Sequence, residues 1–202
     1  MNPFRLFQSG ENVVKLLGIV GSPRRGGNTE FMMREALKAA EQEGAETELV
    51  SLVDFTLKAC DGCRACFETR NCVIRDDVEK LFGKIAEADG MIVGSPVYFY
   101  TVNAQTKTFI DRVGYLNIAR GRKSFINKVG GAIVVARRSG LAYATPQILL
   151  FLVATRMIVA SPAVRALASR KGEAIKDKEG IESARELGTA MVQIAKATAI
   201  LR

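Results

Sequence analysis

Short apolar runs alternate with amphipathic stretches along this chain of 202 residues. Continuous apolar runs are typical of buried parallel strands, whereas apolar residues three and four positions apart indicate helices. The runs predict five strands, at 14–20, 47–53, 91–94, 131–136 and 157–160. The amphipathic stretches predict five helices, at 29–44, 78–88, 103–113, 143–154 and 181–199. This alternation implies right-handed crossovers and a parallel sheet covered on both faces, a three-layer α/β/α class with the strand order 2-1-3-4-5.

Several residues mark the expected ends of these elements. Asn28 or Thr29 is expected to cap the first helix, and Gly44 to end it. Asp76 and Glu79 have the spacing of a capping box at the start of the 78–88 helix. The pair Ser95-Pro96 is expected to end the third strand.

Length and composition favour a single globular domain over residues 1–202, because 48% of the residues are hydrophobic and 25% are charged. The most apolar stretch, 148–160, is shorter than a membrane span and contains Arg156. No secretory signal is recognised at the N-terminus, so a cytoplasmic protein without membrane contact is expected. Residues 1–13 are interpreted as an arm or an ordered extension.

Charge and the absence of histidine restrict the chemistry. The formal charge is +8, but the basic residues are scattered and no nucleic-acid-binding motif organises them, so nucleic acid is not an expected partner. No histidine is present, which excludes nucleophile–histidine schemes and histidine-based zinc catalysis. Redox or group-transfer chemistry in this chain therefore needs a cofactor.

The loop 21–29, GSPRRGGNT, joins the first strand to the first helix and has the composition of a phosphate-binding loop. Gly21, Gly26 and Gly27 give a phosphate close access to backbone N–H groups at a helix N-terminus. Ser22, Asn28 and Thr29 add side-chain donors, and Arg24 adds charge. Neither the triphosphate-binding motif nor the dinucleotide fingerprint is present, so a mononucleotide is the preferred ligand.

This loop, the segment Ser95-Pro96-Val97-Tyr98-Phe99 and the segment 109–112, FIDR, together resemble the NAD(P)H-dependent FMN reductase superfamily, whose fold is flavodoxin-like. The resemblance extends from residue 14 to the C-terminus. It implies that FMN is the cofactor, and that Ser22, Arg24, Asn28 and Thr29, with Gly27 giving clearance, bind its phosphate. It also implies that Pro96, Val97, Tyr98 and Phe99 lie against the isoalloxazine ring. The loop from Ala136 to Gly140 leaves the same sheet edge and is expected to cover the other side of the flavin.

Four cysteines, Cys60, Cys63, Cys66 and Cys72, lie within a loop at 59–76 with the spacing C-x2-C-x2-C-x5-C. No second set exists, so all four are expected to serve one site, most simply a [4Fe–4S] cluster. The spacing resembles that of iron-sulfur flavoproteins of the same superfamily, which carry FMN and one such cluster. Zinc and a clusterless loop with free or paired cysteines remain the alternatives. Arg64, Arg70 and Arg75 would offset the charge of a cluster and raise its potential.

The resulting interpretation is a redox flavoprotein. It passes electrons from ferredoxin or a similar acidic protein through a [4Fe–4S] cluster and FMN to an unidentified acceptor. One alternative is a clusterless NAD(P)H-dependent FMN or quinone reductase, and another is a zinc-bearing interaction module. The cysteine loop follows the second strand, away from the strands that carry the ring. A homo-oligomer, either dimer or tetramer, is therefore expected to bring a neighbour's flavin near the cluster.

Overall fold

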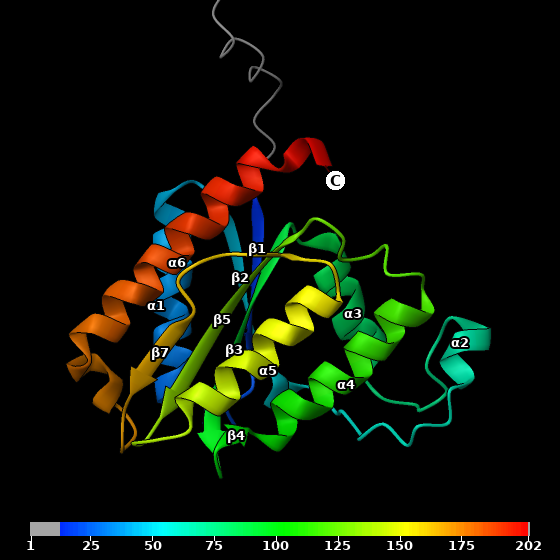
Figure 1. Ribbon diagram of the computed structural model, residues 1–202, viewed down its shortest axis with the longest axis horizontal. Helices are drawn as coiled ribbons and strands as arrows, with labels where there is room; N and C mark the ends of the chain where they lie inside the picture. The colour runs from blue at the N-terminus through cyan, green and yellow to red at the C-terminus, as the bar shows by residue number, and fades with distance from the viewer. Residues whose placement is uncertain (1–12, 202) are drawn as a thin grey trace, which may run out of the picture.

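The computed structural model describes residues 13–201, which form a twisted sheet between two layers of helices (Figure 1). The sheet has seven strands in the order β2-β1-β3-β5-β6, with β7 also paired to β5 and β4 paired to β3. All pairings are parallel except β3 with β4. The strands are β1 (Lys15–Val20), β2 (Glu46–Ser51), β3 (Gly90–Tyr98), β4 (Thr101–Val102), β5 (Val129–Ala136), β6 (Ile158–Val159) and β7 (Val164–Leu167).

Two helices cover one face of the sheet and three cover the other. The first layer contains α1 (Asn28–Gln42) and α6 (Lys178–Ala197), and the second contains α3 (Val78–Glu87), α4 (Ala104–Ala119) and α5 (Leu141–Ala154). Shorter elements are α2 (Ala65–Thr69) and the 3-10 turns η2 (Leu52–Asp54), η3 (Glu173–Lys176) and η4 (Ala199–Leu201). The predicted α/β/α class is confirmed. The expected arm at residues 1–13 lies, apart from Val13, outside the described residues, and the single domain stays a prediction.

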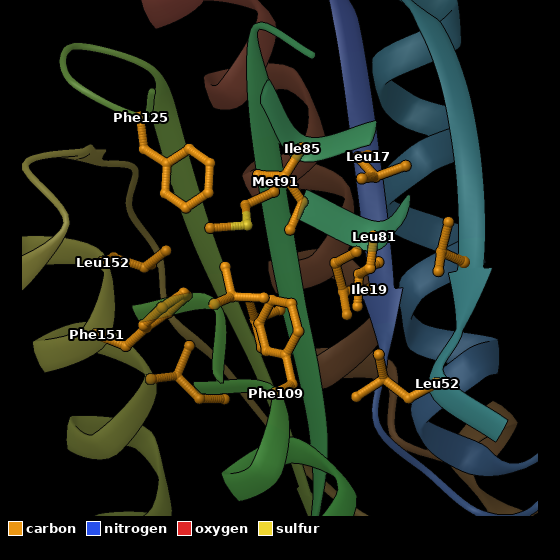
Figure 2. Packing of buried hydrophobic residues seen from close by; sticks show 14 of the residues in the cluster. Leu17, Ile19, Leu52, Leu81, Ile85, Met91, Phe109, Phe125, Phe151 and Leu152 are labelled. Atoms are coloured by element: carbon orange, nitrogen blue, oxygen red, sulfur yellow. The ribbon is translucent and has the colours of Figure 1, made fainter. Parts of the chain in front are cut away.

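Each helical layer buries its own hydrophobic cluster against the sheet. Figure 2 shows the cluster under α3, α4 and α5, where Phe109 of α4 and Phe151 of α5 pack edge to face with ring centroids 5.5 Å apart. The strand residues contributing to this cluster include Leu17, Ile19 and Met91. Strands β1, β3 and β5 are almost continuously buried because both faces of the sheet are covered.

The third strand does not end at Ser95-Pro96, as the sequence suggested. β3 continues to Tyr98, with Pro96 opposite Val135 in the parallel ladder to β5. Proline is tolerated at this point because β1 ends at Val20, opposite Gly94, so Pro96 has no β1 neighbour to which it would donate. The strand then turns back into β4, and this hairpin extends beyond the sheet edge.

The expected fifth strand at 157–160 is also different in the structure. It is represented by β6, which pairs only with Val129 and Gly130 at the beginning of β5. The end of β5 pairs instead with β7, at Ile133 to Ala136. Two short strands, β6 and β7, thus pair with β5 in place of one long edge strand. Of the two, β7 lies beside the C-terminal end of β5, where the carboxyl ends of the strands meet.

Two helices have boundaries that differ from those expected from the sequence, and both differences affect the site. Helix α4 runs to Ala119 rather than ending at Val113, since Leu116 and Ala119 continue its buried face. Helix α1 begins at Asn28 with Gly27 as its N-cap, and no side chain caps it. Among residues 13–201 no helix is long and apolar enough to cross a membrane.

We expect Phe109→Ala to lower the free energy of unfolding by about 3–5 kcal/mol, because it removes a fully buried ring from the α4–α5 cluster. Urea unfolding followed by circular dichroism measures this change. The matched control is Phe99→Ala, whose side chain is 94% exposed, and which we expect to change stability by no more than about 0.5 kcal/mol. Similar losses in the two variants would contradict the placement of Phe109 in the core.

Candidate functional site

A cleft of about 300 Å³ opens at the carboxyl ends of β1, β3, β5 and β7. In an open parallel sheet this edge is where ligands bind. The cleft contains eight of the eleven cofactor-binding residues expected from the sequence, together with five further residues. Its lining residues are Ser22, Arg24, Gly27, Asn28, Thr29, Pro96, Val97, Tyr98, Val135, Arg137, Ala168, Ser169 and Lys171.

The N-terminus of α1 points backbone donors at this cleft. No side chain caps the helix, so the N–H groups of its first residues have neither an intrahelical partner nor a capping partner. A Cβ on Gly27 would lie 2.8 Å from the carbonyl oxygen of Arg24, which explains why the loop has glycine there. An uncapped helix N-terminus lined by Ser22 and Thr29 suits an anion.

Asn28 has a different local role from the expected cap. Its side-chain amide donates to the carbonyl of Arg170, and its side-chain oxygen accepts from the N–H groups of Gly172 and Ala174. The prediction that Asn28 or Thr29 caps α1 was therefore wrong. Asn28 lines the cleft while it fastens the loop after β7 to the phosphate loop.

Three cations line the cleft: Arg24, Arg137 and Lys171. None of the three forms an ion pair within residues 13–201. Lys171 lies over the phosphate loop, since a Cβ on Gly26 would be 3.8 Å from its Nζ. In contrast, Arg25 pairs with Asp54, and Arg138 does not line the cleft. The uncompensated charge therefore gathers where a phosphate would meet α1.

Glu30 stabilises the phosphate loop from within α1. Its carboxylate accepts from the N–H of Gly26 at 2.7 Å and pairs with Arg34 at 2.7 Å. Burial opposes ionisation of this carboxyl, but the hydrogen bonds from Arg34 and Gly26 outweigh it and lower the pKa of Glu30. The loop is thus held by an ionised carboxylate at neutral pH.

Asn103 ties the phosphate loop to the hairpin of β3 and β4. Its Nδ2 donates to the carbonyl of Gly21 at 2.6 Å, and its backbone N–H donates to the buried hydroxyl of Ser95 at 3.3 Å. Gly21 itself donates to the carbonyl of Gly94 and lies so close to Thr106 that a Cβ would collide with its hydroxyl. These contacts fix the two walls of the cleft relative to each other.

Three expected cofactor-binding residues do not line the cleft. Phe99 is at the hairpin tip and is almost fully exposed, and Ala136 is the buried last residue of β5. Gly140 supports the hairpin from behind, because a Cβ there would lie 2.6 Å from a methyl group of Val97 and 3.0 Å from the Cα of Tyr100. Its φ of +96° is also a conformation that glycine adopts readily.

The five further lining residues are Val135, Arg137, Ala168, Ser169 and Lys171, of which only Arg137 belongs to a loop, Ala136 to Gly140, that the sequence placed at the flavin. Three of them follow β7, the strand that the sequence analysis did not predict. The basic pair Arg170-Lys171 was visible, but without β7 nothing connected it to this edge. Burial alternates over VRAL at 164–167 in the structure, but in the sequence only Arg165 is polar, so the alternation that marks a half-buried strand is not visible there.

The cysteine segment, residues 58–76, lies along α4 with α2 in its middle (Figure 1). All four cysteines are free; Cys60 and Cys63 are exposed, whereas Cys66 and Cys72 are half-buried and pack against the α3–α4–α5 cluster. Burial raises the pKa of the Cys66 thiol, and the nearby Cys72, Cys60 and Cys63 raise it further. The other three cysteines therefore lie within electrostatic reach of Cys66.

Two arginines of α4 and its C-terminus hold this segment. Arg112 contacts Lys58, Cys72 and Asp76, and Arg120 donates to the carbonyl of Arg70 and pairs with Glu79 at 2.6 Å. Asp76 and Glu79 thus help to hold the cysteine segment against α4 by pairing with Arg112 and Arg120. Glu79 also accepts from the N–H of Cys72. The expected capping box was wrong, since the N-cap of α3 is Asp77, whose side chain makes no capping bond and accepts from the N–H of Thr56 instead. Asp76 accepts from the N–H of Val78, but Glu79 accepts from Cys72.

The four cysteines are the residue type that binds an iron-sulfur cluster, although their sulfur atoms do not surround a common point in this structure. Four free cysteines in one segment supply the thiolates that a [4Fe–4S] cluster needs. Within residues 13–201, no three His, Cys, Asp or Glu side chains are arranged to hold a metal ion. Cys60 and Cys63 would have to close on the better anchored Cys66 and Cys72.

The fold and cleft define an α/β protein with a basic cleft at the carboxyl edge of its sheet. Two solved structures share this architecture. RosB superposes with a TM-score of 0.73 over 93% of this chain and 81% of its own, at 21% identity. A flavodoxin from an archaeon superposes with a TM-score of 0.63 over 91% of this chain and 99% of its own, at 17% identity. The fold is therefore flavodoxin-like.

Sequence relatives identify the family. Residues 14–171 match the family of NADPH-dependent FMN reductases. An iron-sulfur flavoprotein of Methanocaldococcus jannaschii is 41% identical over 91% of this chain and 98% of its own length. An iron-sulfur flavoprotein of Archaeoglobus fulgidus is 30% identical over 94% of this chain and 99% of its own length. The chain belongs to the NADPH-dependent FMN reductase family as an iron-sulfur flavoprotein, and it is an FMN-dependent oxidoreductase.

We expect Glu30→Gln to lower the free energy of unfolding by about 1–2 kcal/mol near neutral pH, because Gly26 loses a charged acceptor. The pKa of Glu30 is lower in the folded protein than its ordinary value of 4.5, so its stabilisation is complete above that value. It is lost as the pH falls through the lowered pKa, and the difference between the two proteins should vanish there. Urea unfolding at several pH values measures this.

The control is Glu186→Gln, an exposed residue of α6 for which no contact is recorded among residues 13–201. It should match the parent at every pH. A Glu30→Gln protein as stable as the parent near neutral pH would show that the Gly26 contact contributes nothing.

Proposed function

We propose that the cleft binds FMN, with the phosphate at the N-terminus of α1 and the ring against Pro96, Val97 and Tyr98. The observation that carries this proposal is that an uncapped helix N-terminus and three cations, which form no ion pair among residues 13–201, line the same cleft. Ser22 and Thr29 would donate to phosphate oxygens, and Arg24 would neutralise their charge. The hairpin offers apolar surface and backbone N–H groups to a flat ring. Bound FMN supplies both one-electron and two-electron transfer.

We further propose that Cys60, Cys63, Cys66 and Cys72 hold one [4Fe–4S] cluster. The support is the presence of four free cysteines in one short segment, in which α4 holds Cys72 through Arg112 and the carbonyl of Arg70 through Arg120. A reducing cytoplasm is the compartment that keeps such thiols free. The role of the chain is then to bind both cofactors and adjust their potentials, while the electrons pass to an acceptor whose nature stays open.

Anaerobically purified protein distinguishes this function from its alternatives. We expect one FMN and four iron with four sulfide per chain, together with the absorbance of both cofactors. FMN without iron would favour the clusterless NAD(P)H-dependent reductase, and zinc would favour the interaction module. Cys63→Ser should lower the iron content and leave the flavin content unchanged, because Cys63 is exposed and lies outside the cleft.

Ferredoxin or a similar acidic protein is the electron donor we propose. The formal charge of +8 favours an acidic partner, and electrostatic steering makes association faster at low salt. We expect the second-order rate of reduction by ferredoxin to fall as ionic strength rises, measured by stopped-flow absorbance. A rate independent of salt would exclude this recognition, and a faster, salt-independent hydride transfer from NAD(P)H would make the pyridine nucleotide the donor.

A homo-oligomer is also proposed, with α5 in the interface. Helix α5 contains no Asp, Glu, Lys or Arg, and its outer face exposes Tyr143, Leu150 and Val153 at helical spacing. Such a face on an otherwise basic protein suits a second copy, which presents the same uncharged surface. Tyr100, half-exposed at the hairpin, contacts Tyr143 with ring centroids 6.3 Å apart and extends this surface toward the cleft.

We expect Leu150→Glu to shift the protein toward monomer in sedimentation velocity, because it places a charge within the uncharged face of α5. Gln193→Glu, an exposed substitution on α6 in the other helical layer, serves as the control and should sediment like the parent. An unaltered oligomer in the Leu150→Glu protein would remove α5 from the interface.

A further inference from the structure

Arg112 is a buried cation of α4 that binds three separate points of the cysteine segment. Its Nη1 donates to the carbonyl of Lys58 at 2.5 Å and to the carboxylate of Asp76 at 2.7 Å. Its Nη2 donates to the other oxygen of Asp76 at 3.0 Å and to the sulfur of Cys72 at 3.2 Å. The guanidinium therefore joins residues before the first cysteine, after the last cysteine and at the last cysteine itself.

Burial makes these contacts strong and directional. The side chains of Arg112 and Asp76 are 2% and 0% exposed, so water does not compete for their hydrogen bonds. A buried guanidinium needs acceptors for its donors, and Asp76 alone accepts two of them. A third donor is directed at the carbonyl of Lys58 and a fourth at the sulfur of Cys72. An anionic thiolate is a much better acceptor than a neutral thiol.

The two halves of the cysteine segment are held very differently. Cys72 receives a hydrogen bond at its sulfur from Arg112, and its own N–H donates to Glu79. Among residues 13–201 the hydrogen bonds of Cys63 are local, to the carboxylate of Asp61, and Cys60 is exposed. Cys72 is thus the fixed end of the segment and Cys60 to Cys63 the end that must close.

We infer that Arg112 is a positioning residue for the iron-sulfur cluster: it fixes Cys72 as the anchored ligand, and its N–H···S hydrogen bond raises the reduction potential of the cluster. This inference rests on the proposed function. Hydrogen bonds to cluster sulfurs and nearby positive charge stabilise the more negative, reduced state. The arginines of the segment itself do not take this role, because Arg64 and Arg75 are exposed and Arg70 donates to the carbonyl of Ala119.

The test compares the reduction potential of the cluster in three holoproteins prepared anaerobically. The double variant Arg112→Met/Asp76→Asn removes the hydrogen bond to the sulfur of Cys72 without changing the net charge. A change in its reduction potential therefore reports the loss of this hydrogen bond and not a loss of charge. Arg75→Gln removes one exposed positive charge from the same segment. We expect a lower potential in the double variant and the parent potential in Arg75→Gln, measured by redox titration followed by electron paramagnetic resonance.

Iron content and flavin content are measured on the same samples. Loss of iron with full flavin in the double variant supports the anchoring of Cys72, provided that Arg75→Gln keeps its iron. A double variant with the potential and iron of the parent overturns the inference, as does an equal shift in Arg75→Gln. If the double variant fails to fold, the same measurements are made on Arg112→Lys, with the same expected results. Lysine keeps the positive charge but cannot bond to Lys58, Cys72 and Asp76 at once.

Failure of this inference is distinct from failure of the proposed function. Iron missing from the parent protein contradicts the proposed cluster itself. Iron present in the parent, with an unaltered potential when Arg112 is replaced, contradicts only the role of Arg112.

Discussion

The hydrogen bonds of Asn103 are the contacts on which the cleft depends. Parallel strands bring their carboxyl ends to one edge, but this arrangement alone does not set how far apart the loops lie. Asn103 sets that distance by donating to Gly21 in the phosphate loop and to Ser95 in β3. Because Ser95 and Asn103 are buried, each lost bond would leave a buried polar group without its partner. The two walls are therefore held as one unit before any ligand arrives.

A second buried polar cluster, Arg112 with Asp76, organises the other functional segment. A buried ion pair contributes little net stability when its desolvation is included, so its value here is specificity of position. It fastens an otherwise irregular and exposed segment to the rigid helix α4. The cleft and the cysteine segment thus rest on opposite ends of the same helix, since Asn103 caps the N-terminus of α4 and Arg120 follows its C-terminus.

The sequence alone was sufficient for the layers of the fold and for most of the cleft. Buried parallel strands are uniformly apolar and end in glycine-rich turns, so β1, β3 and β5 and the phosphate loop were recognisable. Strand β7 was missed because it is short and follows a turn, and Ser169 and Lys171 were missed with it. The spacing of residues in the sequence predicts hydrogen bonds between near neighbours. These predictions were wrong where a residue distant in sequence bonds to the same side chain.

Asn28 and Asp76 are examples of such side chains. Both have the chemistry of helix caps. Asn28 bonds instead to the loop after β7, at least 142 residues away in sequence. Asp76 accepts from the N–H of Val78 at the start of α3, but it also pairs with Arg112, which is 36 residues away. Arg112 itself was part of a recognised motif, yet its contact with Cys72 depends on the packing of the segment against α4. No spacing rule connects residues 72 and 112.

The most direct test of the central claim is the affinity of the flavin-free protein for FMN compared with riboflavin, measured by quenching of flavin fluorescence. The two ligands share the ring and differ in the phosphate. Charge-assisted hydrogen bonds are worth about 1.5–3 kcal/mol each, so the account predicts that FMN binds at least about 100-fold more tightly. Equal affinities would mean that the N-terminus of α1 and the cations of the cleft do not bind the phosphate, and would contradict the account.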